Sequence, residues 1–374
     1  MGDRSHKRGY AHDKRRITDS LRPDEATWKC QYMSECPTIA VVVVNYRTPD
    51  LALQCLAALR AERAALPSLT AVLVDGGSDD GSAETLRAGL DHPDFRDWVT
   101  FLPLAINGGF GWANNQAILM LARQSSPPDY LHLLNPDTQV QPGAVERLLN
   151  ELKENPTCGA AGSQLLSSDG QVAASAFRFP SFGREFTGAA HSPLISRLLG
   201  IDGIRVRASD KSDVDWVSGA SVMFRTATLR ETGLFDDGFF LYFEEVELLY
   251  RLKTKGWSVR HVPSSVVVHI EGAATGLGAA AAQRPYPPYW YQSRRRYFER
   301  TAGASGLIAA NLCALAGHAL SQLKRFAGRP PGSASFRTAD HFRSGFWPSG
   351  AAARPSIAQL GDAPGRPPAW MSKP

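Results

Sequence analysis

Apolar runs separated by polar turns predict that strands and helices alternate along most of the chain. Residues 39–44 form an apolar, mostly β-branched run, which is typical of a strand buried on both faces. Residues 51–65 then have the apolar periodicity of a helix, and residues 70–74 resemble a second buried strand. This βαβ unit predicts an α/β fold with a mostly parallel sheet flanked by helices.

The same pattern continues beyond this first unit. Further strands are predicted at 99–104, 130–134, 214–225 and 266–270, with helices ending near residue 123, at 144–154 and from about residue 244. Residues 159–212 are rich in Gly and Ser and are expected to supply loops over a site rather than core.

The chain is long enough for one large domain with appendages. We expect a disordered basic tail at 1–36, one catalytic domain at 37–275, an aromatic, basic and helical extension at 276–327, and a disordered Pro/Gly/Ala-rich tail at 328–374. The apolar helix expected at 307–320 is too short to span a bilayer. It is therefore interpreted either as a peripheral membrane contact or as an ordinary terminal helix.

Composition narrows the setting of the protein. Of its 374 residues 43% are hydrophobic, 21% are charged, and the net charge of +5 comes mostly from clusters near the two ends. We interpret these clusters as solvated tails and expect no nucleic-acid partner. The five cysteines are scattered without metal-ligand spacing, and no apolar run suits a secretory signal, so we expect a cytoplasmic protein.

Polar residues follow several of the predicted strands, where open α/β sheets bind ligands. Asp75 begins an acidic, Gly-rich turn, and Gly109 and Gly111 precede a helix without completing a dinucleotide-binding motif. Asp137 follows the 130–134 strand and is either a turn former or a ligand for a hard cation. His269 ends a later strand and is either structural or a late ligand.

Three carboxylates open the helix predicted after residue 243. On a helical wheel Glu244 and Glu247 fall on a polar face with Arg251, where helix electrostatics accounts for them. Glu245 instead shares the apolar stripe of the leucines in 248–252. A carboxylate shielded in this way is a candidate general base.

Several of these segments together resemble family 2 glycosyltransferases with the GT-A (Rossmann-like) fold, most closely bacterial rhamnosyltransferases. The resemblance covers about residues 38–300 and rests on motifs in the family's order. They are Asn45-Tyr46, Asp75 with Ser78-Asp79-Asp80-Gly81-Ser82, Asn107-Gly108-Gly109-Phe110, Asn114-Asn115, Leu134-Asn135-Pro136-Asp137, Trp216-Val217-Ser218-Gly219-Ala220 and Phe243-Glu244-Glu245-Val246-Glu247.

The resemblance implies inverting transfer of a sugar, L-rhamnose from dTDP-L-rhamnose above all, to a saccharide or lipid-linked saccharide in cell-surface polysaccharide synthesis. It makes Glu245 the base and Asp137, with His269, the ligand of a Mg²⁺ or Mn²⁺ ion. The residues that it places around the nucleotide sugar are Asn45, Tyr46, Asp75, Gly109, Asn114, Asn115, Trp216 and Gly219.

The chain departs from the family pattern at three positions. Gly76 and Arg47 stand where Asn is usual, and Glu244-Glu245-Val246-Glu247 replaces the usual Glu-Asp-Val-Asp. The longer glutamate extends the base by roughly a bond length, enough to change the acceptor pocket. A UDP- or GDP-sugar donor, or nucleotide-sugar binding without transfer, remain alternative functions.

Overall fold

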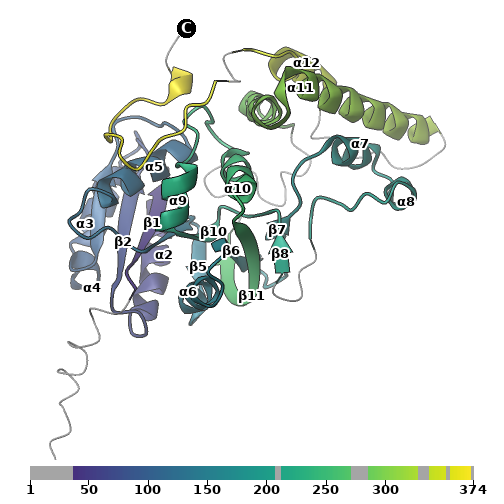
Figure 1. The fold of residues 1–374 in the computed structure, drawn as a ribbon. Helices are drawn as coiled ribbons and strands as arrows, with labels where there is room; N and C mark the ends of the chain where they lie inside the picture. Colours follow the sequence, from purple (N-terminus) through teal and green to yellow (C-terminus); the bar gives the residue numbers. More distant parts are fainter. Residues whose placement is uncertain (1–36, 207–211, 271–284, 327–336, 351–353, 372–374) are drawn as a thin grey trace, which may run out of the picture. The chain divides into compact units, whose positions relative to one another are not determined.

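The computed structural model describes residues 37–206, 212–270, 285–326, 337–350 and 354–371. The tail at 1–36 lies outside these ranges. A central sheet of nine strands runs in the order β3-β2-β1-β4-β10-β6-β11-β5, with β8 paired to β11 (Figure 1). These strands are β1 (Ile39–Asn45), β2 (Leu69–Asp75), β3 (Val99–Pro103), β4 (Tyr130–Leu134), β5 (Thr138–Val140), β6 (Cys158–Leu166), β8 (Ser212–Val214), β10 (Ser221–Arg225) and β11 (Ser258–His269).

The sheet is parallel in one half and mixed in the other. Strands β3, β2, β1 and β4 are parallel, as predicted, whereas β10 runs antiparallel to both β4 and β6. Strand β11 is parallel to β6 and antiparallel to β5 and β8. The register pairs Asn45 with Asp75 and Val43 with Leu134, so the polar turns after these strands meet at one edge.

Helices cover both faces of the sheet and bury two cores (Figure 1). One core lies under α2 (Pro49–Glu62), α3 (Ser82–Leu90) and α6 (Ala144–Glu154), and the other under α5 (Phe110–Leu121), α9 (Thr226–Thr232) and α10 (Glu244–Thr254). A short helix, α4 (Pro93–Arg96), precedes β3. The strands predicted in the first half of the chain therefore form, whereas the predicted strand at 214–225 is divided into strands at 212–214, 216–217 and 221–225, and the one predicted at 266–270 is the end of the longer β11.

Residues 159–212 are more regular than expected. They contain β6, the short strand β7 (Ala176–Phe177), which pairs with β9 (Trp216–Val217), and the helices α7 (Phe182–Ala190) and α8 (Pro193–Leu198). Strand β6 was not predicted because its small residues lack the β-branched pattern of a buried strand. Close packing against neighbouring side chains requires these small residues. A Cβ atom on Gly162 would lie 2.5 Å from Val217 Cβ, so only glycine fits.

A chain of polar side chains crosses the buried centre of the sheet. Nε2 of His132 on β4 lies 3.0 Å from Oγ of Ser221 on β10, which lies 2.7 Å from Oγ of Ser163 on β6. Ser163 Oγ lies 2.8 Å from Ser265 Oγ on β11, and Ser265 Oγ donates to the carbonyl oxygen of Ala144 at 2.8 Å. Each serine hydroxyl in this chain and Nε2 of His132 thereby gain a partner, whereas Nδ1 of His132 has none among the described residues.

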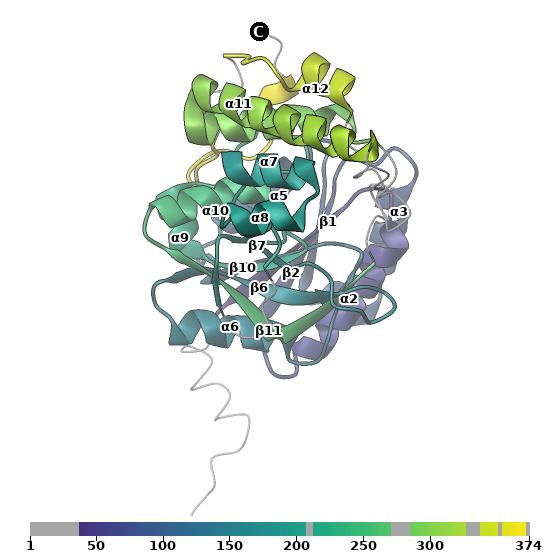
Figure 2. The same ribbon diagram turned by 90° about the vertical axis from the view of Figure 1, so that its right-hand side faces the viewer.

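The C-terminal extension is built on α11 (Pro288–Phe326), which is interrupted by non-helical dihedrals at Gly303 (φ 72°, ψ −178°). It packs on α7, and α12 (Thr338–Ser344) packs on it (Figure 2). The helix is much longer than the expected 307–320. Contrary to expectation, its length and composition would allow it to cross a membrane, with 33% of the apolar window buried.

Residues 354–371, which we call the C-terminal strap, lie against the α/β domain. Leu234 N donates to the Ala358 carbonyl at 2.8 Å, and Trp112 Nε1 donates to the Arg366 carbonyl at 2.8 Å. A short 3₁₀ helix (Ala369–Met371) ends the strap. These contacts differ from the disorder expected beyond residue 328, because backbone pairing and a few apolar anchors compensate for the low-complexity composition.

Candidate active site

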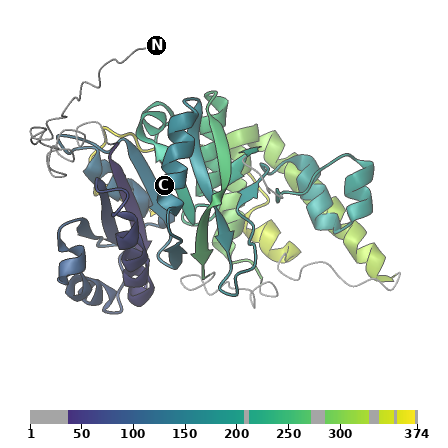
Figure 3. The ribbon, with the colours of Figure 1, turned by 90° about the horizontal axis from the view of Figure 1, so that it is seen from below.

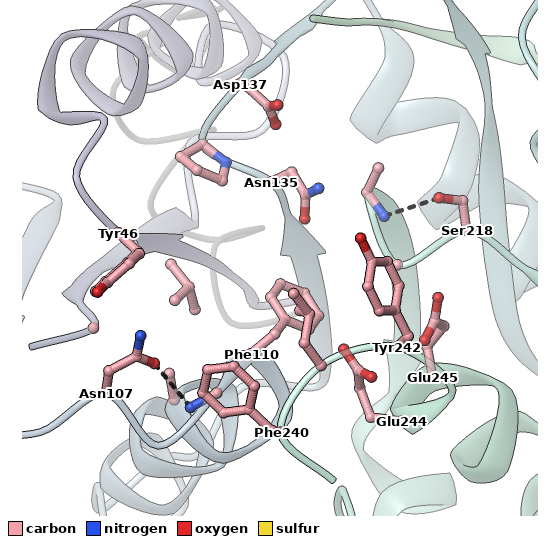
Figure 4. A pocket seen from close by; sticks show the side chains of 18 of the residues that line it. Tyr46, Asn107, Phe110, Asn135, Asp137, Ser218, Phe240, Tyr242, Glu244 and Glu245 are labelled. Atoms are coloured by element: carbon pink, nitrogen blue, oxygen red, sulfur yellow. Dashed lines mark hydrogen bonds between the residues drawn. The ribbon is translucent and has the colours of Figure 1, made fainter. Parts of the chain in front are cut away.

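A cavity of about 450 Å³ opens at the edge where the loops after β1, β2 and β4 meet the segment before α10 (Figure 4). Its walls come from eight regions of the chain. They are lined by Val44, Tyr46, Gly76, Asn107, Gly109, Phe110, Ala113, Asn135, Pro136, Asp137, Ser218, Gly219, Ala220, Phe240, Leu241, Tyr242, Glu244, Glu245, His269 and Tyr289. The structure therefore brings Tyr46, Gly109, Asp137, Gly219, Glu245 and His269 together from the predicted set.

Asp137 and His269 form a pair at the cavity wall. The antiparallel pairing of β5 with β11 sets His269 opposite Thr138, and Asp137 Oδ1 lies 3.2 Å from His269 Nε2. The Asp137 carbonyl also accepts a hydrogen bond from Ile270 N at 2.9 Å, which holds the two strand ends together. Both side chains are largely buried but face the cavity.

This pair fits a divalent cation. A carboxylate oxygen and an imidazole nitrogen converge on one point, as ligands of Mg²⁺ or Mn²⁺ do. Within the described ranges no group of three or more His, Cys, Asp and Glu residues has metal-site geometry. Asp137 and His269 would therefore hold a cation whose remaining positions are filled by water and a substrate, which is typical of metal ions bound together with phosphates.

Glu244 and Glu245 lie on another wall of the cavity, at the start of α10 (Figure 4). Glu244 is 3% exposed and Glu245 is half-buried. Burial raises the pKa of both carboxyls above the ordinary value, and the neighbouring Glu245 charge raises the pKa of Glu244 further. A carboxylate with a raised pKa that faces a cavity is suited to accept a proton.

The helical-wheel prediction for these carboxylates was wrong in part. Glu244 and Glu247 were expected on a solvated face, yet Glu247 is 1% exposed. The reason is that α11 covers this face, so that Arg300 Nη2 reaches Glu247 Oε1 at 3.4 Å. The predicted i,i+4 pair is confirmed, with Arg251 Nε 2.9 Å from Glu247 Oε2.

The turn before α10 has an unusual backbone. Tyr242 and Phe243 are consecutive non-glycine residues with φ of 69° and 67°, a conformation that costs roughly 1–3 kcal/mol per residue. Aromatic contacts from α11 hold it: Tyr242 stacks on Tyr289 at 6.0 Å, and Phe243 meets Trp290 edge-on at 5.6 Å. Ser293 Oγ also donates to the Leu241 carbonyl at 2.9 Å. The extension therefore fixes the turn that aims Glu245.

Tyr289 is a cavity residue that the sequence prediction missed. It belongs to α11, outside the predicted catalytic domain, and its ring meets Phe240 at 5.5 Å as well as Tyr242. The aromatic run at 286–291 was a usable signal, since aromatic rings gather where flat ligands or apolar walls are needed.

Asn45 and Asp75 are buried beneath the cavity rather than lining it. Asn45 Nδ2 donates to Asp75 Oδ1 at 2.9 Å, and Asp75 Oδ2 accepts from Ser78 N at 2.9 Å. Asn45 Oδ1 accepts from Thr48 N at 3.1 Å. The pair ties the turns after β1 and β2 together and leaves neighbouring Tyr46 to face the cavity.

The asparagines of α5 are not among the residues that line the cavity. Asn114 is fully buried and donates to the Phe110 carbonyl at 2.9 Å. Asn115 donates to Phe235 O and Asp237 Oδ1, at 2.9 and 2.7 Å, and accepts from Phe235 N at 3.0 Å. The Asn115 amide thus anchors the loop before α10, whereas the Asn114 amide bonds within α5, although both had been expected to hold the nucleotide.

Two glycines approach the cavity for different reasons. Gly109 has φ of 90°, and a Cβ atom there would lie 2.0 Å from the Phe240 carbonyl oxygen, so its loop and the segment before α10 touch backbone to backbone. A Cβ atom on Gly219 would lie 3.7 Å from Glu245 Cγ, which is ordinary contact. Gly219 therefore leaves space beside the carboxylate that a ligand can use.

Trp216 lies apart from the cavity lining. Its ring stacks on Phe177 at 4.1 Å, and its Nε1 donates to the Arg178 carbonyl at 3.0 Å. Trp370 of the strap lies closer to the site, because its ring meets Phe240 at 5.1 Å and its Nε1 donates to the Gly108 carbonyl at 3.2 Å. Trp370 was not predicted, since the strap was expected to be disordered.

The mixed sheet, the Asp137–His269 pair at a strand end and the carboxylates on another wall of the cavity fit a transferase site of the GT-A type. The chain belongs to the family described as "Glycosyltransferase like family 2", whose profile matches residues 37–285, more than half of the chain. It is a rhamnosyltransferase-like glycosyltransferase, in line with the names of its curated relatives.

Two relatives and one solved structure illustrate the similarity. An N-acetylglucosaminyl-diphospho-decaprenol L-rhamnosyltransferase from Mycobacterium tuberculosis is 31% identical over 221 residues, covering 57% of this chain and 70% of that protein. The rhamnosyltransferase WbbL of Escherichia coli is 28% identical over 170 residues, covering 43% and 60%. A mannosyltransferase from Pyrobaculum calidifontis, solved with GDP-Man and Mn²⁺, is 15% identical with a TM-score of 0.48, covering 79% and 76%.

Proposed function

We propose that the protein is an inverting glycosyltransferase that moves L-rhamnose from dTDP-L-rhamnose to a hydroxyl of a lipid-linked saccharide. The observation that carries this proposal is one cavity with Glu245 on one wall and the Asp137–His269 pair on another. A base for an acceptor hydroxyl and a site for a donor diphosphate thus face the same space.

The proposed reaction is a single displacement at the anomeric carbon. The Glu245 carboxylate takes the proton of the acceptor hydroxyl, whose oxygen forms the new glycosidic bond. The bond from the anomeric carbon to the diphosphate breaks, and its electron pair leaves with the nucleoside diphosphate. A Mg²⁺ or Mn²⁺ ion held by Asp137 and His269 would neutralise charge on that diphosphate. Attack from the face opposite the leaving group inverts the configuration.

The surroundings of Glu245 support its role as the base. Phe110 and Tyr242 line the cavity beside it and limit the access of water, which raises its proton affinity. Gly219 leaves room next to its Cγ, where an acceptor hydroxyl can approach. The aromatic walls at Phe240 and Tyr289 suit the apolar face of a sugar ring.

The donor and acceptor are proposed from the relatives. Both curated relatives are named as rhamnosyltransferases, and the mycobacterial one is named for a diphospho-decaprenol-linked sugar acceptor. If the acceptor is lipid-linked, the reaction takes place at a membrane surface, for which we propose the cytoplasmic face of a bacterial membrane. UDP- and GDP-sugars are the competing donors, and Tyr46, which lines the cavity, would contact any of these bases.

Incubation of purified protein with dTDP-rhamnose, UDP-sugars and GDP-sugars, with Mn²⁺ or Mg²⁺ and a soluble N-acetylglucosaminyl diphospholipid analogue, tests the proposal. We expect release of dTDP and a product whose anomeric configuration, read by NMR, is opposite to that of the donor. Consumption of only a UDP- or GDP-sugar would overturn the donor. Metal-dependent nucleotide binding without release of any nucleoside diphosphate would overturn catalysis and favour a binding protein.

A further inference from the structure

The second part of α11 presents an apolar stripe to solvent. Residues 301–323 contain no Asp, Glu, Lys or Arg. Leu312 is 56% exposed and Leu323 is 64% exposed, and the exposed alanines 316 and 319 lie between them. Because these positions are spaced by four, three and four residues, they fall on one face of the helix.

This stripe is the outer face of α11, since the opposite face is already packed. Leu307, Ala310 and Ala314 are buried, and Gly317 lies so close to α7 that a Cβ atom there would be 2.3 Å from the Phe186 carbonyl oxygen. A surface helix of a soluble protein normally carries polar and charged residues on its outer face. The outer face of α11 is apolar instead.

Helix α8 adds exposed leucines at the same end of the extension (Figures 2 and 3). Leu194, Leu198 and Leu199 are 64%, 76% and 53% exposed. Lys324 follows Leu323 in the chain, and its Nζ donates a hydrogen bond to the Ala190 carbonyl at 2.8 Å. Ala190 lies three residues before the start of α8. The leucines of α8 therefore lie near the end of the α11 stripe.

Cations lie closer in sequence to these leucines than the exposed acidic residue Asp202 does. Residues 186–201 contain no Asp or Glu, and Arg197 is exposed between Leu194 and Leu198. Lys324 follows the uncharged part of α11. Exposed leucines bordered by cations are the pattern by which proteins bind the interface of an anionic membrane.

We propose that Leu312 and Leu323 of α11 with Leu194 and Leu198 of α8 form a docking surface for an anionic lipid bilayer. This proposal rests on the proposed function, because binding to a membrane would bring the enzyme to a lipid-linked acceptor. Tyr289, near the start of α11, lines the cavity, so one helix joins the docking surface to the site.

The contacts of α11 favour lying on the membrane over crossing it. Asn311 is fully buried on the inner face and accepts a hydrogen bond from Arg294 at 2.6 Å, which insertion into hydrocarbon would break. The non-helical residue Gly303 interrupts the helix. Pairing with a second copy is disfavoured because it would bring Arg197 and Lys324 of both copies together, with Asp202 as the nearest following acidic residue of each copy.

Flotation with vesicles of phosphatidylcholine alone, and of phosphatidylglycerol and phosphatidylcholine in equal parts, tests the surface on the full chain. We expect the wild type to float with the anionic vesicles. Leu198→Glu and Leu323→Glu should each lower the partitioning of the protein onto vesicles about tenfold. Each substitution removes a leucine that would be buried in the bilayer and adds a negative charge that the anionic lipids repel. Val172→Glu, at an apolar position that is 73% exposed outside this surface, is the matched control and should float like the wild type.

Three outcomes would overturn the docking surface. The wild type could fail to float with either vesicle, Leu323→Glu could abolish a dimer seen by sedimentation, or the protein could resist alkaline extraction as a spanning helix does. Transfer to a soluble acceptor is measured on the same preparations and should be unchanged in Leu198→Glu. Flotation without transfer to any acceptor would refute the proposed function alone, whereas transfer without flotation would refute the docking surface alone.

Discussion

Replacing the two cavity carboxylates one at a time should separate catalysis from stability. Glu244→Gln and Glu245→Gln keep the shape of each side chain and remove its charge. The two residues are adjacent in α10 and both are shielded from water, and each has an Oε2 atom without a hydrogen-bond partner among the described residues. They form a matched pair in which only Glu245 is assigned as the base.

The expected effect on activity follows from general-base catalysis, which contributes about 10²–10⁴-fold. We expect Glu245→Gln to lower kcat by that factor and Glu244→Gln to lower it less than about threefold. Wild-type activity should rise with pH as Glu245 ionises, through a midpoint above the ordinary carboxyl pKa, because burial raises the pKa of Glu245.

The free energy of unfolding of the wild type should fall as the pH rises, whereas its activity should rise. The pKa of each carboxyl is raised in the folded state, so the folded protein keeps a proton that the unfolded chain releases above about pH 4.3. The stability present at acidic pH is therefore lost as pH rises through the raised pKa. Each substitution, Glu244→Gln or Glu245→Gln, removes this loss. We therefore expect each variant to have a free energy of unfolding about 1–3 kcal/mol higher than the wild type at pH 8, and its Tm should rise by roughly 2–4 °C per kcal/mol.

The assay combines nucleoside diphosphate release from pH 5 to 9 with thermal unfolding at both ends of that range. If Glu245→Gln keeps a tenth or more of the wild-type kcat, Glu245 is not the base. If Glu244→Gln loses as much activity as Glu245→Gln, the base assignment moves to Glu244. A lower Tm for both variants at pH 8 would contradict the burial argument.

Three further predictions test other parts of the site. Asp137→Asn should remove the Mn²⁺ dependence of donor binding in calorimetry, and an unchanged dependence would place the cation elsewhere. Trp370→Ala should raise the donor KM about tenfold by freeing Phe240 from the strap, whereas Trp347→Ala, 65% exposed, should not change it. Gly109→Ala should lower the free energy of unfolding by roughly 2–3 kcal/mol or more. Gly81 also has a positive φ, of 86°, but has open space around it, so Gly81→Ala should lower the free energy of unfolding by only about 1 kcal/mol. Equal losses would show that the contact of Gly109 with Phe240 is relaxed.

The parts of the site that could be predicted are those set by strand order. Asp137 and His269 follow apolar strands with clear boundaries, and strand ends in an α/β sheet converge on one edge. Their 3.2 Å approach also depends on the antiparallel pairing of β5 with β11, and β5 was not predicted. The same logic placed Tyr46 beside the cavity, since it follows β1 directly.

The parts that could not be predicted depend on packing from distant segments. A helical wheel treats α10 as if one face met solvent, but α11 covers that face, and so Glu247 is buried with Arg300. Asn115 resembled a ligand-binding amide, yet its partners lie 120 residues further along the chain. No local pattern records such contacts, because they depend on where the chain returns in space.

The buried polar chain across the sheet fixes the direction in which its protons point. Ser265 Oγ donates its only proton to the Ala144 carbonyl, so it must accept from Ser163, which in turn must accept from Ser221. With its own proton used, Ser221 can only accept from His132, whose Nε2 therefore carries hydrogen. Burial lowers the pKa of His132 to about 3, so the ring is neutral at physiological pH. A ¹⁵N NMR spectrum should accordingly show one histidine locked as the Nε2–H tautomer, and that single proton orients hydroxyls on three neighbouring strands.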